Sequence, residues 1–418
     1  MNAITKLTGT ALLCLMAGCA GSTGAGEGVD GLTVIDVESA MDNLQAELTL
    51  SDVADSVWYL PLETTDACLV GEDPSVRLMR GRVVVRANSG NDCLVFDGQT
   101  GRFLNSIGHV GEDPEGHSGN MPEYDERSGR LYFTRYPNSL QKFDVEGHYQ
   151  GKLTLSGIEL SNCSLVSADS LLVCYPFHIP LFEGENKLFL FNTRGQAVDS
   201  VIFPWAEPPV AGKELVSIDI ESIDIEDESM GRLYLEYADK SFWVWEADKM
   251  DVQDGQVTFH PAFSDTLYAL SGNSLRPLVA LHTGKYQFPA VKGRTVKSGY
   301  SDRLVTKRIA VTPGKICFSC ELDTYGARQL YEGIYDRRTG HTRLSPASQD
   351  GYKDDLTGFM PVPWFFPQGV QVSLIEAYKV VEWLDEHPEA RDNPALAVLA
   401  QVKEEDNPVV VFVRYKSE

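Results

Sequence analysis

The sequence predicts an all-β fold, a six-bladed β-propeller of four-stranded antiparallel blades with a short helical insertion in the last blade. The first observation is a recurring segment in which Phe or Tyr precedes Asp or Asn and then Gly, as in LVFDGQTGRFL, LQKFDVEGHYQGKL and LFLFNTRGQAV. The second is its period, because Asp97, Asp144 and Asn192 lie 47 and 48 residues apart. The third is that short apolar runs separated by turn residues fill each unit, which is typical of a propeller blade.

The chain begins with the features of a bacterial lipoprotein signal. A mostly apolar stretch covers residues 7–17, and the sequence LMAGC then ends in Cys19 after small residues. This segment resembles the lipobox of bacterial lipoproteins, and the resemblance implies that residues 1–18 are a signal peptide and that Cys19 is lipidated. An ordinary secretory signal with a chance cysteine is the alternative. Residues 19–31 are small and flexible, so we expect them to form a tether.

The apolar runs that follow are assigned to blades in chain order. Blade one holds VRLMR, GRVVVRA, CLVFD and GRFLNSI, blade two holds RLYFTR, LQKFD and YQGKLTL, and blade three holds NCSLV, SLLVCYP, KLFLFN and AVDSVIF. Two longer units come next, one through RLYLEYA, SFWVWEA and DTLYAL, the other through RLVTKRIAV, KICFSCE and LYEGIYD. In the recurring segment, the Asp or Asn can cap a turn and the Gly accepts a left-handed conformation, so we interpret the segment as structural.

The sixth unit contains the helical insertion, at about 373–405. Ser373 and Glu376 have capping-box spacing, and Pro388 ends the first helical run. The strong strand VVVFVRY comes afterwards, while VWYLPL at 57–62 precedes blade one. We expect these two strands to pair and close the ring, because closure removes two exposed edges. A single propeller domain then covers residues 32–418.

The chain also resembles a family of six-bladed β-propeller lipoproteins of Gram-negative gut anaerobes, whose function is largely unassigned. The resemblance rests on VWYLPLETT, FDGQTGRFLNSIG, DTLYAL with LRPLVALHTGKYQFP, and the closing NPVVVFVRYK. These segments are architectural and contain no catalytic signature. The chain departs from the family after the Ile-Gly pair, where Asp113, Glu115 and His117 stand in place of Gly, Gly and Tyr.

Charge and composition exclude several classes of function. The formal net charge is −24, from 36 Lys and Arg against 60 Asp and Glu, which repels nucleic acid phosphates. No glycine loop of a nucleotide-binding type precedes a helix, and no second long apolar run could span a membrane. We therefore expect no nucleic acid partner, no cofactor and no transmembrane span. The lipid anchor favours the outer over the inner membrane of the cell envelope, with surface and periplasmic display both open.

Candidate metal and redox motifs are weak. In SIDIESIDIEDES, at 217–229, four acidic residues lie close together, but the Gly-turned loop of a calcium site is missing, so a solvated strand face is favoured. The CFSC segment has zinc or redox spacing, yet Cys317 and Cys320 would point to opposite faces of a strand. No catalytic, cofactor or metal residue is assigned.

We expect ligands at the face of the ring that carries the longer loops, because rigid scaffolds usually bind there. The candidate ligand-binding residues on this face are Arg135, Tyr136, His178, Trp205, Tyr286, Tyr325, Arg328 and Trp364. Each aromatic residue also has the simpler interpretation of packing in the core. Two functions stay open. One is a non-enzymatic scaffold that holds a glycan, a peptide or an envelope protein. The other is a glycan-processing hydrolase or lyase, which needs two or more carboxylates, or a His/Tyr/Arg group, that converge in the mouth of the propeller.

A disulfide between Cys163 and Cys174 is the last expectation. The segment NCSLVSADSLLVCYP is typical of a hairpin with SADS as its loop. If Val166 pairs with Leu171, the two cysteines face each other at a distance that a disulfide can bridge. Two buried thiols are the alternative.

Overall fold

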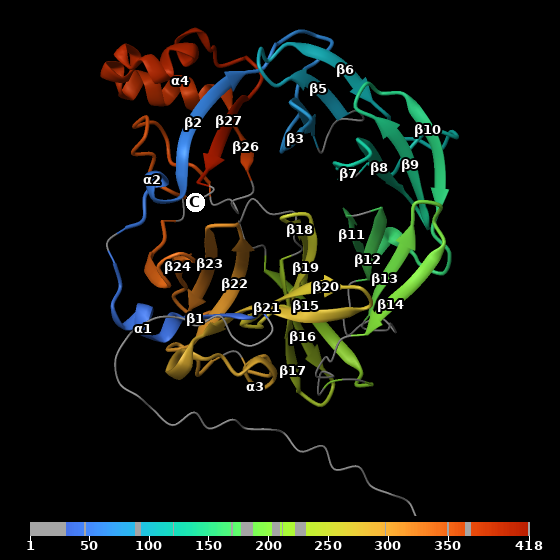
Figure 1. Cartoon of the computed structure of the whole chain (residues 1–418), viewed down its shortest axis with the longest axis vertical. Coiled ribbons are helices and arrows are strands. Elements are labelled where there is room, and N and C mark those ends of the chain that lie inside the picture. Colours follow the sequence, from blue (N-terminus) through green and yellow to red (C-terminus); the bar gives the residue numbers. More distant parts are fainter. Residues whose placement is uncertain are drawn as a thin grey trace, which may run out of the picture.

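The structure of the chain is a computed structural model. It describes residues 31–45, 47–87, 93–119, 121–168, 170–176, 187–202, 210, 212–221, 231–296, 298–348, 351–363 and 369–416. The predicted all-β propeller class is confirmed, because seven sheets, mostly four-stranded and antiparallel, make up the described part of the chain (Figure 1). Cys19 lies outside the described residues.

Four sheets follow the chain as antiparallel meanders of four strands. They consist of β3 (Ser75–Met79), β4 (Arg82–Arg86), β5 (Cys93–Asp97) and β6 (Phe103–Ile107); β7 (Glu123–Asp125), β8 (Arg130–Arg135), β9 (Ser139–Asp144) and β10 (Tyr149–Thr154); β11 (Cys163–Ala168), β12 (Leu171–Pro176), β13 (Lys187–Asn192) and β14 (Ala197–Ile202); and β22 (Leu304–Val311), β23 (Lys315–Leu322), β24 (Gln329–Asp336) and β25 (His341–Pro346). They match predicted blades one to three and the second of the two longer units.

The other three sheets differ in strand number. One holds β18 (Lys249–Gln253), β19 (Gln256–His260), β20 (Thr266–Ser271) and β21 (Ser274–His282), with β1 (Thr33–Asp36) added in parallel to β21. Another holds β2 (Ala54–Pro61), β27 (Val409–Tyr415) and β26 (Val370–Ile375), and the last holds β15 (Leu215–Glu221), β16 (Arg232–Tyr237) and β17 (Phe242–Trp245). The sequence analysis placed β15–β17 and β18–β21 in a single unit.

Six of the seven sheets form a ring, because each shares a buried hydrophobic cluster with the sheet on either side. Val84 of β4 and Phe133 of β8 lie in one such cluster, and Tyr132 of β8 and Leu172 of β12 lie in the next. Further clusters join β11–β14 to β18–β21, that sheet to β22–β25, β22–β25 to β2 and β27, and these strands to β3–β6. Burial of apolar surface between neighbouring sheets therefore holds the ring together.

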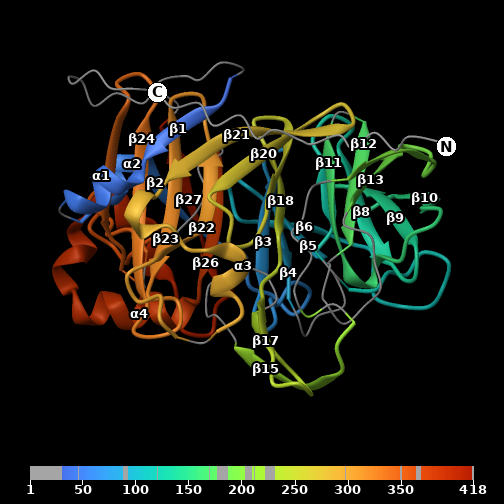
Figure 2. The ribbon, with the colours of Figure 1, turned by 90° about the horizontal axis from the view of Figure 1, so that it is seen from below.

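The seventh sheet, β15–β17, lies outside this ring. It is inserted between β14 and β18, and Val244 of β17 packs with Phe263, Phe288 and Val305. In Figure 2, β15 and β17 extend from the ring on the same side as α4 (Ala377–Glu386). The insertion therefore adds surface to one face of the propeller.

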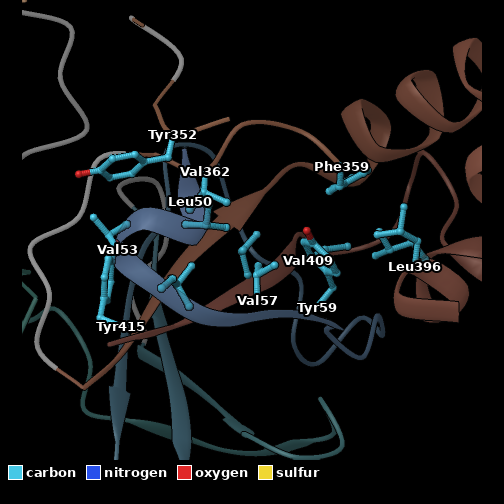
Figure 3. Packing of buried hydrophobic residues seen from close by; sticks show 14 of the residues in the cluster. Leu50, Val53, Val57, Tyr59, Tyr352, Phe359, Val362, Leu396, Val409 and Tyr415 are labelled. Carbon is cyan, nitrogen blue, oxygen red and sulfur yellow. The ribbon is translucent and has the colours of Figure 1, made fainter. Parts of the chain in front are cut away.

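The expected closing pair is present, with β2 antiparallel to β27. Val57 lies opposite Val413, and Tyr59 lies opposite Val411. Figure 3 shows Val57, Tyr59 and Val409 in one packed cluster, which Leu396 of the helical insertion also joins. The Tyr59 hydroxyl donates to Asp354 Oδ2 at 2.9 Å, so its polar end is satisfied inside this core.

The helical elements are short. They are α1 (Val37–Asp42), α2 (Leu50–Val53), α3 (Ala290–Gly293), α4 (Ala377–Glu386) and the 3-10 segments η1 (Leu160–Asn162), η2 (Gly284–Tyr286), η3 (Pro388–Asp392) and η4 (Pro394–Gln401). The predicted capping box at Ser373 is wrong. Ser373 lies in β26 opposite Val411, so α4 begins only after Glu376. Because Ser373 lies within a strand, it is not available as a helix cap.

The recurring Asp-Gly segment is a turn, as predicted. Asp97 Oδ1 accepts hydrogen bonds from the backbone of Gln99 and Thr100 at 3.1 and 2.9 Å. Gly101 follows with a φ of 69°, and a Cβ there would lie 2.1 Å from the carbonyl oxygen of Pro61. Only glycine fits this close approach between neighbouring sheets.

The predicted pairing of Cys163 with Cys174 is wrong in register. Ala168 of β11 lies opposite Leu171 of β12, and Ser170 has a φ of 69°, whereas the prediction paired Val166 with Leu171 across a four-residue loop. Cys163 therefore lies opposite Pro176, and Cys174 lies opposite Leu165. Both cysteines keep their thiols. Burial raises the pKa of Cys174, which behaves as a small apolar residue in its cluster.

The two cysteines of CFSC diverge, as expected. Cys317 is buried in the cluster that β23 shares with β2 and β27, whereas Cys320 is buried in the cluster toward β20 and β21. They lie on opposite faces of one sheet and cannot share a metal ion or a disulfide.

Candidate functional site

The ring has two faces that differ in the length of their connections. The short-turn face carries turns such as 97–102 and 336–340, and the long-loop face carries connections such as 322–329. The added sheet β15–β17 and the helix α4 lie on the long-loop face (Figure 2). This face therefore carries the largest departures from a plain ring of blades.

A cluster of charged residues forms where β15–β17 meets β22–β25, and we call it the junction cluster: Arg232, Glu246, Glu321, Lys307, Glu221 and Arg328. Arg232 of β16 is fully buried at its centre. Its guanidinium donates to Glu246 Oε1 at 2.6 Å, to Glu321 Oε1 at 3.0 Å and to the carbonyl oxygen of Thr324 at 2.7 Å. These partners compensate for the loss of water around a buried charge.

The junction cluster extends outward from this buried centre. Lys307 Nζ lies 2.6 Å from Glu246 Oε2. On the outer side, Glu221 of β15 accepts a hydrogen bond from the Tyr234 hydroxyl at 2.6 Å and pairs with Arg328. The Arg328 side chain is 26% exposed, so the network reaches the surface of the long-loop face.

Opposing effects set the pKa values in this region. Burial alone would raise the pKa of Glu246, but the charges of Lys307 and Arg232 lower it to about 2. Burial and the charge of Lys307 lower the pKa of Lys249 of β18 to about 8, although the charge of Glu246 opposes the shift. The junction cluster is therefore a network of ion pairs between fixed charges.

A second group of charges comes from strands near the centre of the ring. Glu123 of β7 accepts a hydrogen bond from the backbone N–H of Ser167 at 2.9 Å, and Arg77 of β3 donates to it at 3.4 Å. Burial raises the pKa of Glu123 to about 7, although Arg77 opposes the shift, and burial also raises the pKa of Asp251 of β18. Carboxyl groups with raised pKa values can act as general acids.

The predicted ligand-binding residues do not form one group. Tyr325 and Arg328 come together at the junction cluster, where the Tyr325 ring lies 5.8 Å from the Arg232 guanidinium. Tyr286 has a different partner, because its hydroxyl donates to Asp42 Oδ1 at 2.7 Å, which ties α1 to η2. The remaining predicted aromatic and imidazole positions lie outside the described residues: His178, Trp205 and Trp364.

Arg135 and Tyr136 lie on a third part of the molecule. Arg135 donates to the carbonyl oxygens of Asp113 and Gly116 and so fixes the loop that departs from the family pattern. In that loop, His117 stacks on Phe133 with ring centroids 4.3 Å apart, and burial lowers its pKa to about 4. Arg135 therefore has a structural role, whereas the Tyr136 ring is 44% exposed.

Motif reasoning missed the centre of the junction cluster. Arg232, Glu246 and Glu321 each stand beside or within apolar strand segments, GRLYLEY, FWVWEAD and KICFSCEL. A charge inside a buried strand requires a partner, because isolated ions are rarely buried. Three such charges of both signs were a signal that could have suggested an internal network.

Neither a metal site nor a membrane helix is evident in the described part of the chain. There, no group of three or more His, Cys, Asp and Glu side chains is arranged to hold a metal ion. Of the predicted acidic strand face at 217–229, the structure describes residues 217–221, which belong to β15. Likewise, no described helix is long and apolar enough to cross a membrane.

A family model covers almost all of the described structure. The model of a family named "Domain of unknown function (DUF4934)" matches residues 32–414. No curated protein matches the chain. The match therefore assigns the chain to a family but does not indicate an activity.

Among solved structures, the chain is similar to a "Putative exported protein" from Bacteroides fragilis NCTC 9343. The TM-score is 0.58 and the identity 13%, and the match covers 92% of this chain and 99% of the other. A further match is the WD40 β-propeller domain of Doa1, with a TM-score of 0.32, 12% identity and coverage of 70% and 88%. At these identities the first likeness concerns the fold alone.

Proposed function

The chain belongs to the family named domain of unknown function (DUF4934), and we propose that it is a non-enzymatic binding or assembly scaffold of the cell envelope. In this proposal Cys19 carries a lipid anchor, at the outer rather than the inner membrane, and the long-loop face holds the ligand. The lipobox-like LMAGC supports the anchor, and the name of the Bacteroides fragilis structure supports export. The ligand is a glycan, a peptide or a partner protein.

The observation that carries the proposal is a row of exposed aliphatic side chains on β15. Val216, Ile218 and Ile220 are 57%, 43% and 70% exposed. Among the described strands, β15 is the edge of its sheet. An edge strand offers unpaired backbone donors and acceptors to another chain, and exposed apolar side chains beside it are typical of an interaction site.

The surroundings of this row favour a polypeptide over a glycan. Leu235 and Leu233, which lie opposite Ile218 and Ile220, are buried with Trp243 in one cluster, so the exposed row continues a packed apolar surface. An extended peptide that paired with β15 would bury its own apolar side chains there. A sugar ring gains most from a flat aromatic face, which this row lacks. We therefore propose an extended segment of a partner protein as the occupant.

In-cell cross-linking tests the proposed function. A photo-reactive residue would replace Ile220 in the full-length chain, and the matched control would place it at Val198 of β14, an aliphatic position that is 51% exposed on another sheet. We expect a discrete protein adduct from position 220 that disappears when Ile218→Lys is added. Equal adducts from both positions, or none from position 220, would contradict the proposal.

The proposed lipid anchor has its own test. Cys19→Ser should move the full-length chain from the membrane fraction to the soluble fraction, because the lipid on this cysteine is its only proposed membrane contact. Unchanged membrane retention of the variant would refute the anchor and would leave the binding proposal standing.

Glycan processing is the alternative function, and one observation favours it. Glu123 and Asp251 are carboxyl groups near the centre of the ring whose pKa values are raised, as an acid in a hydrolase or lyase requires. Under this alternative, the wild-type chain releases products from an envelope or host glycan, and Glu123→Gln abolishes the release. A panel of glycans without any turnover would remove the alternative.

A further inference from the structure

A pocket of about 280 Å³ lies on the short-turn face, away from β15. It is formed between the turns of the β22–β25 sheet and the segment that leads into β2, and charged groups dominate its lining: Asp52, Lys315, Asp336, His341, Arg343 and Lys416. Its volume is near the lower end of the range for pockets that hold small ligands. This pocket is independent of the function proposed for the long-loop face.

Three cations enter the pocket from separate segments of the chain. Lys315 Nζ donates to the backbone carbonyl oxygen of Asp52 at 3.0 Å, and Lys416 Nζ donates to that of Ser51 at 2.6 Å. Arg343 Nη1 pairs with Asp52 Oδ1 at 2.6 Å. Within the described part of the chain, neither lysine forms an ion pair with a carboxylate. Each ammonium therefore keeps donor capacity for a ligand.

The two carboxylates in the lining are already engaged. Asp52 accepts the ion pair from Arg343 and a hydrogen bond from the backbone N–H of Thr49 at 2.9 Å. Asp336 accepts a hydrogen bond from the backbone N–H of Thr339 at 2.8 Å, which closes the turn between β24 and β25. Three cations against two carboxylates leave a positive excess in the lining. The excess stands out in a chain with a net charge of −24.

The cations are close enough to influence one another. Burial lowers the pKa of Lys315, and the charges of Lys416 and Arg343 lower it further. Like charges gathered at one point repel each other, so an anion placed between them would relieve the repulsion. Arg343 and the lysines together provide the directional and the compact donors that bind oxyanions.

We propose that this pocket binds a small ligand through a carboxylate, sulfate or phosphate group. The oxyanion contacts Lys315, Lys416 and the remaining donors of Arg343, while the rest of the ligand occupies the space toward His341. The ligand is either a free inorganic anion or an acidic sugar, since both present a negatively charged oxyanion to the three cations.

Isothermal titration calorimetry on the full-length chain in detergent tests the pocket. The probes are inorganic phosphate, inorganic sulfate and glucuronate, with glucose as the neutral comparison. We expect at least one anionic probe to bind, and Lys315→Gln and Lys416→Gln each to weaken it about tenfold, because each removes one charged hydrogen bond. The matched control is Lys403→Gln, which changes an exposed lysine near the helical insertion.

The results separate the ligand sources and the role of the pocket. Tighter binding of glucuronate than of either inorganic anion supports an acidic sugar, whereas the reverse order supports a free inorganic anion. The proposal is overturned if glucose binds as tightly as the anions or no anionic probe binds. It is also overturned if the two pocket variants bind like Lys403→Gln. Circular dichroism of the variants excludes loss of folding as the cause.

Discussion

At the residue scale, the junction cluster shows how the added sheet is held. Arg232 is buried without any exposed surface, yet its guanidinium donates to three oxygens. Two of these, from Glu321 and Thr324, lie 89 and 92 residues away along the chain. Such a residue specifies one arrangement of β15–β17 on the ring, because any other arrangement leaves a buried charge without partners.

Removal of the Arg232 charge should be costly. Arg232→Met leaves Glu321 and Glu246 buried with fewer partners, and we expect the free energy of unfolding to fall by about 3–5 kcal/mol. Urea unfolding followed by tryptophan fluorescence measures the loss. Arg391→Met is the control, because it breaks an exposed ion pair with Asp385, and such pairs contribute about 1 kcal/mol or less. Equal losses in the two variants would show that Arg232 is not the anchor of the sheet.

The buried carboxyl of Asp248 predicts a pH dependence. The carboxyl accepts hydrogen bonds from the Tyr175 hydroxyl and from the backbone N–H of Ala262, and burial raises its pKa from 3.8 to about 7. The folded state then holds a proton that the unfolded state has lost. This contribution to stability is complete below pH 3.8 and disappears as the pH rises through 7.

Asp248→Asn isolates that contribution, because asparagine keeps an acceptor and cannot titrate. Relative to the variant, the wild-type chain should lose on the order of 2–3 kcal/mol between pH 5 and pH 8. Denaturation curves at both pH values give the difference. If the free energies of unfolding of the wild type and the variant change in parallel with pH, the Asp248 carboxyl is ionised throughout this range and its pKa is not raised.

Sequence reasoning at this scale found some residues and missed others. Tyr325 and Arg328 were predicted as ligand-binding residues, and they do belong to a polar cluster on the long-loop face. Arg232 was not predicted, because its partners Glu246 and Glu321 are 14 and 89 residues away along the chain. Contacts between residues so far apart in sequence depend on how the sheets pack against each other. Local sequence patterns carry no information on this packing.

At the scale of elements, β27 is the strand on which closure depends. It pairs with β2 on one side and with β26 on the other. Its first five residues, from Val409 to Val413, are four valines and one phenylalanine, and all five are buried. The early strand β2 and the last described strand are therefore joined in one sheet, and the ring has no open seam there.

A truncated side chain in this strand should weaken the ring. Val411 lies opposite both Tyr59 and Ser373 and is 1% exposed, so Val411→Ala should cost about 2 kcal/mol through lost burial and the cavity it leaves. Val198→Ala on β14, where the side chain is 51% exposed, should cost less than about 0.5 kcal/mol. Thermal and urea unfolding would compare them, and similar losses would argue against a central role for β27.

Element boundaries were less predictable than element types. The hairpin of β11 and β12 was recognised, but its turn is two residues shorter than predicted, and the shift moved Cys174 from Cys163 to Leu165. The insertion helix was also recognised, but Ser373 pairs with β27 as part of β26, so the helix begins later than predicted. In both cases hydrogen bonds to a neighbouring strand, rather than local preference, decided the boundary.

At the scale of the whole molecule, the repeat made the propeller class predictable, because each unit must bury its faces against the next. The insertion of β15–β17 was hidden, since its strands have the same apolar alternation as those of the ring. The added sheet nevertheless distinguishes this molecule from a plain ring of blades, and the exposed row on β15 belongs to it. The central claim is that a partner protein adds a strand to β15.

Amide hydrogen exchange on β15 tests that claim most directly, in the free full-length chain and in its complex with the protein cross-linked to position 220. Amides that face β16 are already bonded, so a strand added at the edge should slow exchange at the alternate β15 amides at least tenfold. The amides of β14 should exchange as before. Unchanged exchange along β15 in the complex, with protection elsewhere on the surface, would contradict the claim.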